Sequence, residues 1–96
     1  MFSFFNGPTE IVGKDKLDNG IIVSTVLTPD EGYETAILDD AGTYPVERYD
    51  GREGAESGHR KWMVDGALLG NGDTIMMLGW LSLIGEEEVT IVLENS

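Results

Sequence analysis

The stretch GYETAILDDAGTYPVERYDGREGAESGHRKW, residues 32–62, decides the fold of this 96-residue chain. It opens with a strand pattern over Tyr33–Leu38, turns at Asp39–Gly42 and continues with a second strand pattern over Tyr44–Tyr49. The second pattern contains Pro45, which has no backbone N–H to donate. We therefore expect this strand to lie at a sheet edge or to begin after the proline. A helix pattern follows it, so the stretch predicts a protein with both strands and a helix.

The helix is expected over about residues 51–65. Asp50 followed by Glu53 is typical of the capping pair at a helix N-terminus. Gly54 and Gly58 each weaken the helix by up to about 1 kcal/mol, but they would also permit close packing on the sheet. An apolar stripe recurs at helical spacing, which indicates the buried face: Ala55, His59, Trp62, Met63 and Gly66.

Working outward toward the N-terminus, residues 21–27 are rich in β-branched side chains and predict another strand. A turn signal at residues 28–32 separates this strand from Tyr33–Leu38, so the two strands are expected to form an antiparallel hairpin. Residues 1–20 show an aromatic cluster and a polar run with turn signals at Asn6–Pro8 and Asp18–Gly20. No strand is predicted there.

The C-terminal part is less clear in its pattern. Residues 74–84 suit either a helix or a buried strand by periodicity, and the flanking turns and short length favour a strand. Residues 88–94 alternate and predict a half-buried strand, joined to the previous segment by a hairpin through Gly85–Glu87. We therefore expect one α+β domain over residues 1–96, with an antiparallel sheet of about five strands packed by one helix.

The composition is that of an acidic globular protein, with 41% hydrophobic residues, 18 acids, 6 bases and a net charge of −12. Nucleic-acid binding depends on lysines and arginines that face phosphates, so no direct nucleic-acid partner is expected. Four of the six bases lie between Arg48 and Lys61, and none follows Trp62. The excess acid either keeps the protein in solution or docks on a basic partner.

Several classes of site and location are not expected. The chain has no cysteine, which excludes disulfides, zinc–thiolate sites and a thiol nucleophile. The longest apolar run, residues 75–84, is too short to span a bilayer, and residues 1–5 are shorter than the core of a signal peptide. No membrane partner and no targeting segment are therefore expected.

His59 is the only histidine and the clearest candidate for chemistry. Ser57, two residues away, would not face it on a helix. We interpret His59 as a hydrogen-bonded structural histidine, with a site histidine as the alternative. The acidic clusters lack the spacing of a calcium loop, and residues 66–72 lack the Lys-Ser/Thr that follows a phosphate loop. No catalytic residue, metal or cofactor is predicted.

Aromatic side chains near both ends of the chain are candidates for contact with a partner. Phe2, Phe4 and Phe5 precede the first strong turn, and Trp80 lies in the apolar segment 74–84. These side chains either fold onto the core or project as anchors of the kind enriched at protein interfaces.

Three short motifs together resemble a known group of proteins. They are Gly32–Ile37 (GYETAI), Pro45–Tyr49 (PVERY) and the helical pattern of Ala55, Gly58–His59 and Trp62. This combination resembles small uncharacterised proteins of tailed bacteriophages and related prophages. The resemblance covers about residues 20–63, and the C-terminal third lies outside it. It implies a phage protein and brings no catalytic residue with it.

These observations predict a non-enzymatic phage protein that acts by protein–protein contact, as a small structural or accessory component of the virion. The alternative is an acidic inhibitor of a basic host protein, either a nucleic-acid-binding or a defence protein. A third hypothesis is an enzyme that uses His59 with a carboxylate. The expected location is the virion or the host cytoplasm, and self-association is left open.

Overall fold

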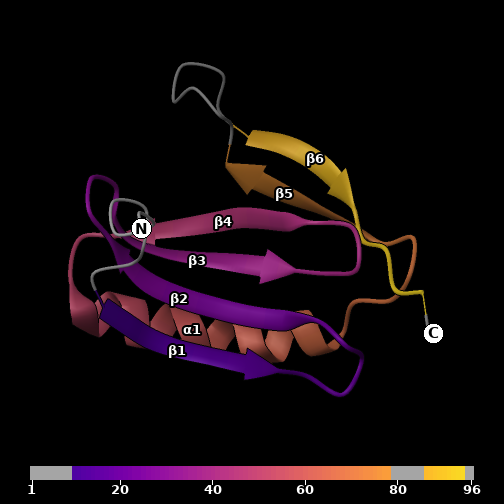
Figure 1. Ribbon diagram of the computed structural model, residues 1–96, viewed down its shortest axis with the longest axis horizontal. Helices are drawn as coiled ribbons and strands as arrows, with labels where there is room; N and C mark the ends of the chain where they lie inside the picture. The colour runs from indigo at the N-terminus through magenta and orange to yellow at the C-terminus, as the bar shows by residue number, and fades with distance from the viewer. Residues whose placement is uncertain (1–9, 79–85, 95–96) are drawn as a thin grey trace, which may run out of the picture.

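The computed structural model describes residues 10–78 and 86–94. One α-helix covers one face of a four-stranded antiparallel sheet with the order β1-β2-β3-β4, and a two-stranded sheet, β5-β6, lies beside β4 (Figure 1). The elements in chain order are β1 (Glu10–Lys16), β2 (Ile22–Thr28), β3 (Gly32–Leu38), β4 (Thr43–Tyr49), α1 (Arg52–Ala67), β5 (Thr74–Leu78) and β6 (Glu86–Thr90).

The central strands form as the sequence predicts. β2 and β3 pair as an antiparallel hairpin in which Thr28 lies opposite Gly32 and Thr25 opposite Thr35. Gly32 has a φ of 77°, a conformation that glycine adopts without strain, and this explains the tight turn before β3. β4 is the last strand of the sheet, so the expected edge position of Pro45 is confirmed.

β1 was not predicted from the sequence, where residues 1–20 show only turns and a polar run. Most of its residues are exposed, and charged Lys14, Asp15 and Lys16 follow one another. Such charges are usual on edge strands, where they discourage pairing with other chains, and they hide the alternation of a strand. A register shift between Ile11 and Gly13 disturbs the pattern further.

The predicted α+β class is confirmed, and the expected number of about five strands is roughly consistent with the structure, but the prediction of a single sheet is corrected. β5 and β6 pair only with each other and form a second sheet. Residues 74–78 are a strand, as favoured, whereas residues 79–85 lie outside the described part of the chain. The predicted hairpin pairing of the two segments is confirmed, because β5 and β6 pair antiparallel. Its turn does not include Glu86 and Glu87, which pair with Leu78 and Met77.

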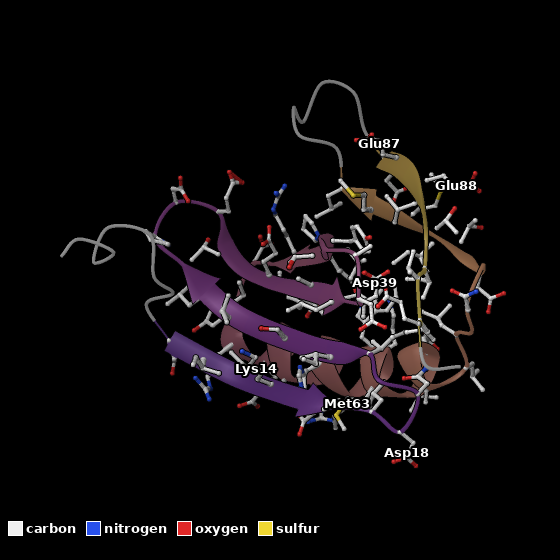
Figure 2. The ribbon with its side chains drawn as sticks, turned by 45° about the vertical axis from the view of Figure 1, so that its right-hand side comes forward. Lys14, Asp18, Asp39, Met63, Glu87 and Glu88 are labelled. Carbon is white, nitrogen blue, oxygen red and sulfur yellow. The ribbon has the colours of Figure 1, made fainter. Side chains whose placement is uncertain are left out.

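The last predicted strand, residues 88–94, ends early at Thr90. Beyond it the chain leaves the hairpin and crosses the end of the main sheet, where Asp39 holds it (Figure 2). One Asp39 oxygen accepts the backbone N–H of Val92 at 2.8 Å, and the other accepts those of Ala41 and Gly42. Burial raises the pKa of Asp39, but these hydrogen bonds outweigh burial and lower it below its ordinary value. The segment is therefore a strap tied to the β3–β4 turn.

Ile91 and Leu93 of this strap complete the apolar core. Ile91 is fully buried, and Leu93 is nearly so. The alternation in the sequence correctly indicates which of these side chains turn inward, although it assigns the wrong backbone structure to them. The core cluster draws on both halves of the chain: Ile21, Val23, Ile37, Val46, Ile91 and Leu93.

The helix begins at Arg52 rather than after a capping side chain. Its N-cap is Gly51, with no side-chain hydrogen bond, so the predicted capping role of Asp50 is wrong. The predicted close packing at the helical glycines is present at Gly58, where an added Cβ would overlap the hydroxyl of Tyr49. Because Gly58 has no side chain, the phenol ring of β4 can pass beneath the helix.

Candidate functional site

The helix and the sheet meet partly through polar side chains, and His59 lies at the centre of them. It is 7% exposed, and both ring nitrogens have partners. Nδ1 lies 2.7 Å from the hydroxyl of Thr25 on β2, and Nε2 lies 2.8 Å from a carboxylate oxygen of Asp15 on β1. Gly13 leaves room for the ring, since a Cβ there would lie 2.6 Å from Nε2.

Thr25 and Thr35 extend this contact into the sheet. They are opposite one another in the β2–β3 hairpin, and both are fully buried. Their hydroxyl oxygens lie 2.5 Å apart. A buried hydroxyl without a partner would cost roughly 1–3 kcal/mol, and each threonine hydroxyl avoids this cost through its hydrogen bond with the other.

β4 and α1 supply the other end of the chain. The hydroxyl of Tyr49 lies 3.0 Å from the Thr35 oxygen and 3.1 Å from Oε1 of Glu47. The same Glu47 oxygen accepts hydrogen bonds from Nε1 of Trp62 at 2.9 Å and from Nζ of Lys61 at 3.1 Å. No buried side-chain nitrogen or oxygen among the described residues lacks a partner. We call the continuous set from Asp15 through His59, Thr25, Thr35 and Tyr49 to Glu47 the polar chain.

The environment shifts the pKa values at the Glu47 end in opposite directions. Burial raises the pKa of Glu47, but hydrogen bonds from Trp62, Lys61 and Tyr49 outweigh it and lower the pKa below its ordinary value. Burial, together with the nearby Glu47 charge, raises the pKa of Tyr49 to about 12, although a hydrogen bond with Thr35 opposes the shift. Glu47 is thus held as a carboxylate and Tyr49 as a neutral phenol.

The raised pKa of Tyr49 predicts a loss of stability in alkali. A group whose pKa is higher in the folded than in the unfolded chain stabilises the fold fully below pH 10 and loses this contribution as pH rises toward 12. Because Tyr49 is partly exposed, we expect a loss of only about 1 kcal/mol. Urea unfolding of the wild type and of Tyr49→Phe between pH 8 and pH 11.5 measures it. The difference between the two proteins should shrink as pH rises, and a constant difference would contradict the assignment.

The order of Asp15, His59 and Thr25 is that of a nucleophile activated by a histidine and a carboxylate. Thr25, however, is fully buried and bonded to Thr35, so no substrate atom can reach its hydroxyl oxygen. Residues 10–78 and 86–94 contain no group of three or more His, Asp or Glu side chains that could hold a metal ion. The polar chain therefore has the composition of a catalytic site without the access that one needs.

The outer surface offers contacts of a different kind. Among the residues that the structure describes, four large apolar side chains are exposed, namely Ile11, Val64, Leu68 and Met76. Val64, in the last turn of α1, and Leu68, its C-cap residue, are 65% and 79% exposed and lie four residues apart, so they face outward together. On β6, Glu87 and Glu88 are exposed at a distance from α1 (Figure 2).

The candidate residues from the sequence differ in whether the structure describes them. Phe2, Phe4, Phe5 and Trp80 lie outside the described residues. His59 lies inside, on the stripe expected for it. Sequence reasoning missed its partners, because Asp15 belongs to a strand that was not predicted. The hairpin register places Thr25 opposite Thr35, and this signal was available from the turn at residues 28–32.

Comparisons with known proteins identify no relative. No family model, no curated protein and no solved structure matches the chain. Within the described part of the chain, no helix has the length and apolarity needed to cross a bilayer.

Proposed function

We propose that this protein is non-enzymatic and acts by protein–protein contact, as a small component of a phage virion. One observation carries the proposal. His59 and its partners Thr25 and Thr35 are buried and bonded to one another, whereas large apolar side chains are exposed on the surface. The phage context rests on the resemblance of residues 20–63, and the location that goes with it is the virion or the host cytoplasm.

The outer face of α1 is the best supported contact surface. Val64 and Leu68 form an apolar pair, and Lys61 lies one turn before Val64 with its side chain 52% exposed. Single exposed apolar residues are ordinary, but two that are adjacent on one helix face form a continuous patch. A partner that covers this pair would gain roughly 25 cal/mol for each Å² of apolar surface buried.

The alternative is an inhibitor that docks acidic side chains on a basic host protein. Three bases are already paired within the molecule: Arg48 with Glu31 and Glu34, Arg52 with Glu10 and Glu56, and Lys61 with Glu47. On β6, by contrast, Glu86, Glu87 and Glu88 are all exposed, and none has an ion pair within the described residues. This row of carboxylates is the observation that favours the inhibitor.

A pull-down from infected-cell lysate distinguishes the two functions. The virion hypothesis predicts that capsid or tail proteins are recovered at both low and high salt, because apolar contacts are not screened. It also predicts that Val64→Ser/Leu68→Ser reduces recovery at least tenfold. Mass spectrometry of purified particles should detect the protein itself, and its absence from the particles would remove the virion hypothesis.

Two further variants complete this experiment. Glu53→Gln alters an exposed position of α1 away from the apolar pair, so recovery should be unchanged. Neutralising Glu86, Glu87 and Glu88 together should leave binding intact if the helix is the contact. Loss of a basic host protein in that variant and in high salt would instead identify the inhibitor.

A further inference from the structure

We propose that Asn71, in the loop between α1 and β5, is a site of spontaneous deamidation and that the isoaspartyl product loosens the strap. Asn71 precedes Gly72, and glycine has no side chain to hinder attack by its backbone nitrogen on the preceding side-chain amide. Within residues 10–78 and 86–94, one other pair of this kind is present, Asn19–Gly20 between β1 and β2. The same pair therefore occurs in two surroundings, and its contacts decide which copy reacts.

The reaction needs only water in addition to the chain. The backbone nitrogen of Gly72 bonds to Cγ of Asn71, and the side-chain amino group leaves as ammonia, taking the hydrogen of that nitrogen. Water then opens the cyclic imide. Cleavage between the nitrogen and Cγ gives aspartate, whereas cleavage between the nitrogen and the main-chain carbonyl carbon gives isoaspartate, in which the backbone runs through Cβ and Cγ. Either product adds one negative charge to the net charge of −12.

The contacts of Asn71 favour this reaction. The residue is exposed, and its side-chain oxygen accepts the backbone N–H of Leu93 at 2.9 Å. A donor at this position stabilises the negative charge that develops on the oxygen during attack. The amino group that must leave has no hydrogen bond among the described residues. The contact that has to break is the 2.8 Å hydrogen bond from the N–H of Gly72 to the carbonyl of Ile91.

Asn19, by contrast, is held through every polar atom of its amide. It is half-buried, and its amino group donates to the carbonyls of Gly66 at 2.8 Å and Leu69 at 2.9 Å, where α1 ends. Its oxygen accepts the N–H of Ile21 at 3.0 Å. The N–H of the glycine that follows donates to the carbonyl of Leu17 at 2.9 Å. Reaction here would disturb four hydrogen bonds, so Asn19 is protected.

The isoaspartyl product changes the backbone at the point where the strap is attached. The carbonyl of Ile91 accepts the N–H of Gly72, and the N–H of Ile91 donates to the carbonyl of Asp73 at 2.7 Å. An additional methylene between residues 71 and 72 shifts the partners of Ile91 along the chain. The aspartyl product keeps the ordinary backbone and a carboxylate oxygen that can accept the N–H of Leu93. Only the isoaspartyl product should therefore loosen the strap.

Mass spectrometry of tryptic peptides tests the site of reaction. The full chain is incubated at pH 8, once folded and once unfolded in urea, and samples are digested at intervals. Trypsin cleaves after lysine and arginine, so Asn19 falls in peptide 17–48 and Asn71 in peptide 62–96. Fragmentation of the second peptide distinguishes Asn71 from Asn95. The mass gained when an amino group is replaced by a hydroxyl then gives the rate at each position.

In the folded protein Asn71 should react at least about tenfold faster than Asn19, because fewer hydrogen bonds oppose its reaction. In urea neither residue has these contacts, and the two rates should be similar. Asn71→Gln should abolish the gain at position 71, since the longer side chain closes a ring much more slowly. Equal rates at the two sites in the folded protein would overturn the proposal. So would a folded protein that keeps Asn71 intact over the time in which urea converts it.

Hydrogen exchange of the Ile91 amide, followed by NMR, tests the effect on the strap. The isoaspartyl product is separated by chromatography from the parent and from the aspartyl product. Its Ile91 amide should exchange at least about tenfold faster than that of the parent, because local opening becomes easier. Asn71→Asp is the matched control, with the same added charge on an ordinary backbone, and its Ile91 amide should exchange as in the parent. Unchanged exchange in the isoaspartyl product would overturn the role of the strap, and equally fast exchange in Asn71→Asp would assign the effect to charge instead.

Discussion

Replacing Ile91 by alanine is expected to destabilise the fold by about 3 kcal/mol, the largest effect of any substitution considered for this chain. Ile91 is fully buried in the cluster that contains Ile21, Val23 and Ile37. The backbone of Ile91 is fixed by two hydrogen bonds. Its N–H donates to the carbonyl of Asp73, and its carbonyl accepts the N–H of Gly72. Because the backbone cannot collapse into the space left by the side chain, a cavity remains and adds to the lost transfer energy.

The matched control for Ile91→Ala is Val89→Ala. Val89 lies two residues earlier, half-buried on β6 and outside the core cluster. We expect this change to cost less than about 1 kcal/mol. Equilibrium unfolding in urea, followed by circular dichroism, measures both variants. Equal costs would show that Ile91 belongs to an ordinary half-buried strand, as the sequence pattern predicts, and not to a strap that closes the core.

That contrast illustrates which parts of the fold the sequence could reveal. Alternation identifies Ile91 and Leu93 as inward-facing, because burial depends on local pattern. It cannot show that the backbone leaves the β5–β6 hairpin at Thr90, since that path depends on Asp39 and Asp40, more than 50 residues away in the chain. Contacts of this length follow from the assembled fold rather than from local propensity.

The polar chain divides in the same way. His59 falls on the helical stripe, and Thr25 opposite Thr35 follows from the length of one turn. Asp15 could not be placed, because it lies on an edge strand whose charges hide its pattern. The contact between Tyr49 and the threonine pair could not be predicted from the sequence either. It depends on the position of β4 in the sheet and on the space left by Gly58.

Two glycines of α1 are expected to respond in opposite directions to the same substitution. Gly54→Ala should stabilise the protein by up to about 1 kcal/mol, because alanine is the better helix former. The new Cβ would lie 3.6 Å from the Cβ of Tyr49, an ordinary contact distance. Gly58→Ala gains the same helix propensity, but its Cβ would overlap the hydroxyl and ring of Tyr49.

Gly58→Ala should therefore destabilise the protein by about 2 kcal/mol, since overpacking of this kind costs up to about 3 kcal/mol before the gain in helix propensity is subtracted. The ring of Tyr49 must move, and with it the contacts to Thr35 and Glu47. The double variant Gly58→Ala/Tyr49→Ala removes the overlap, so Gly58→Ala should be nearly neutral or stabilising in that background. A double-mutant cycle from urea unfolding measures this coupling. Additive effects would show that Gly58 does not make room for Tyr49, and the two glycines would then be equivalent.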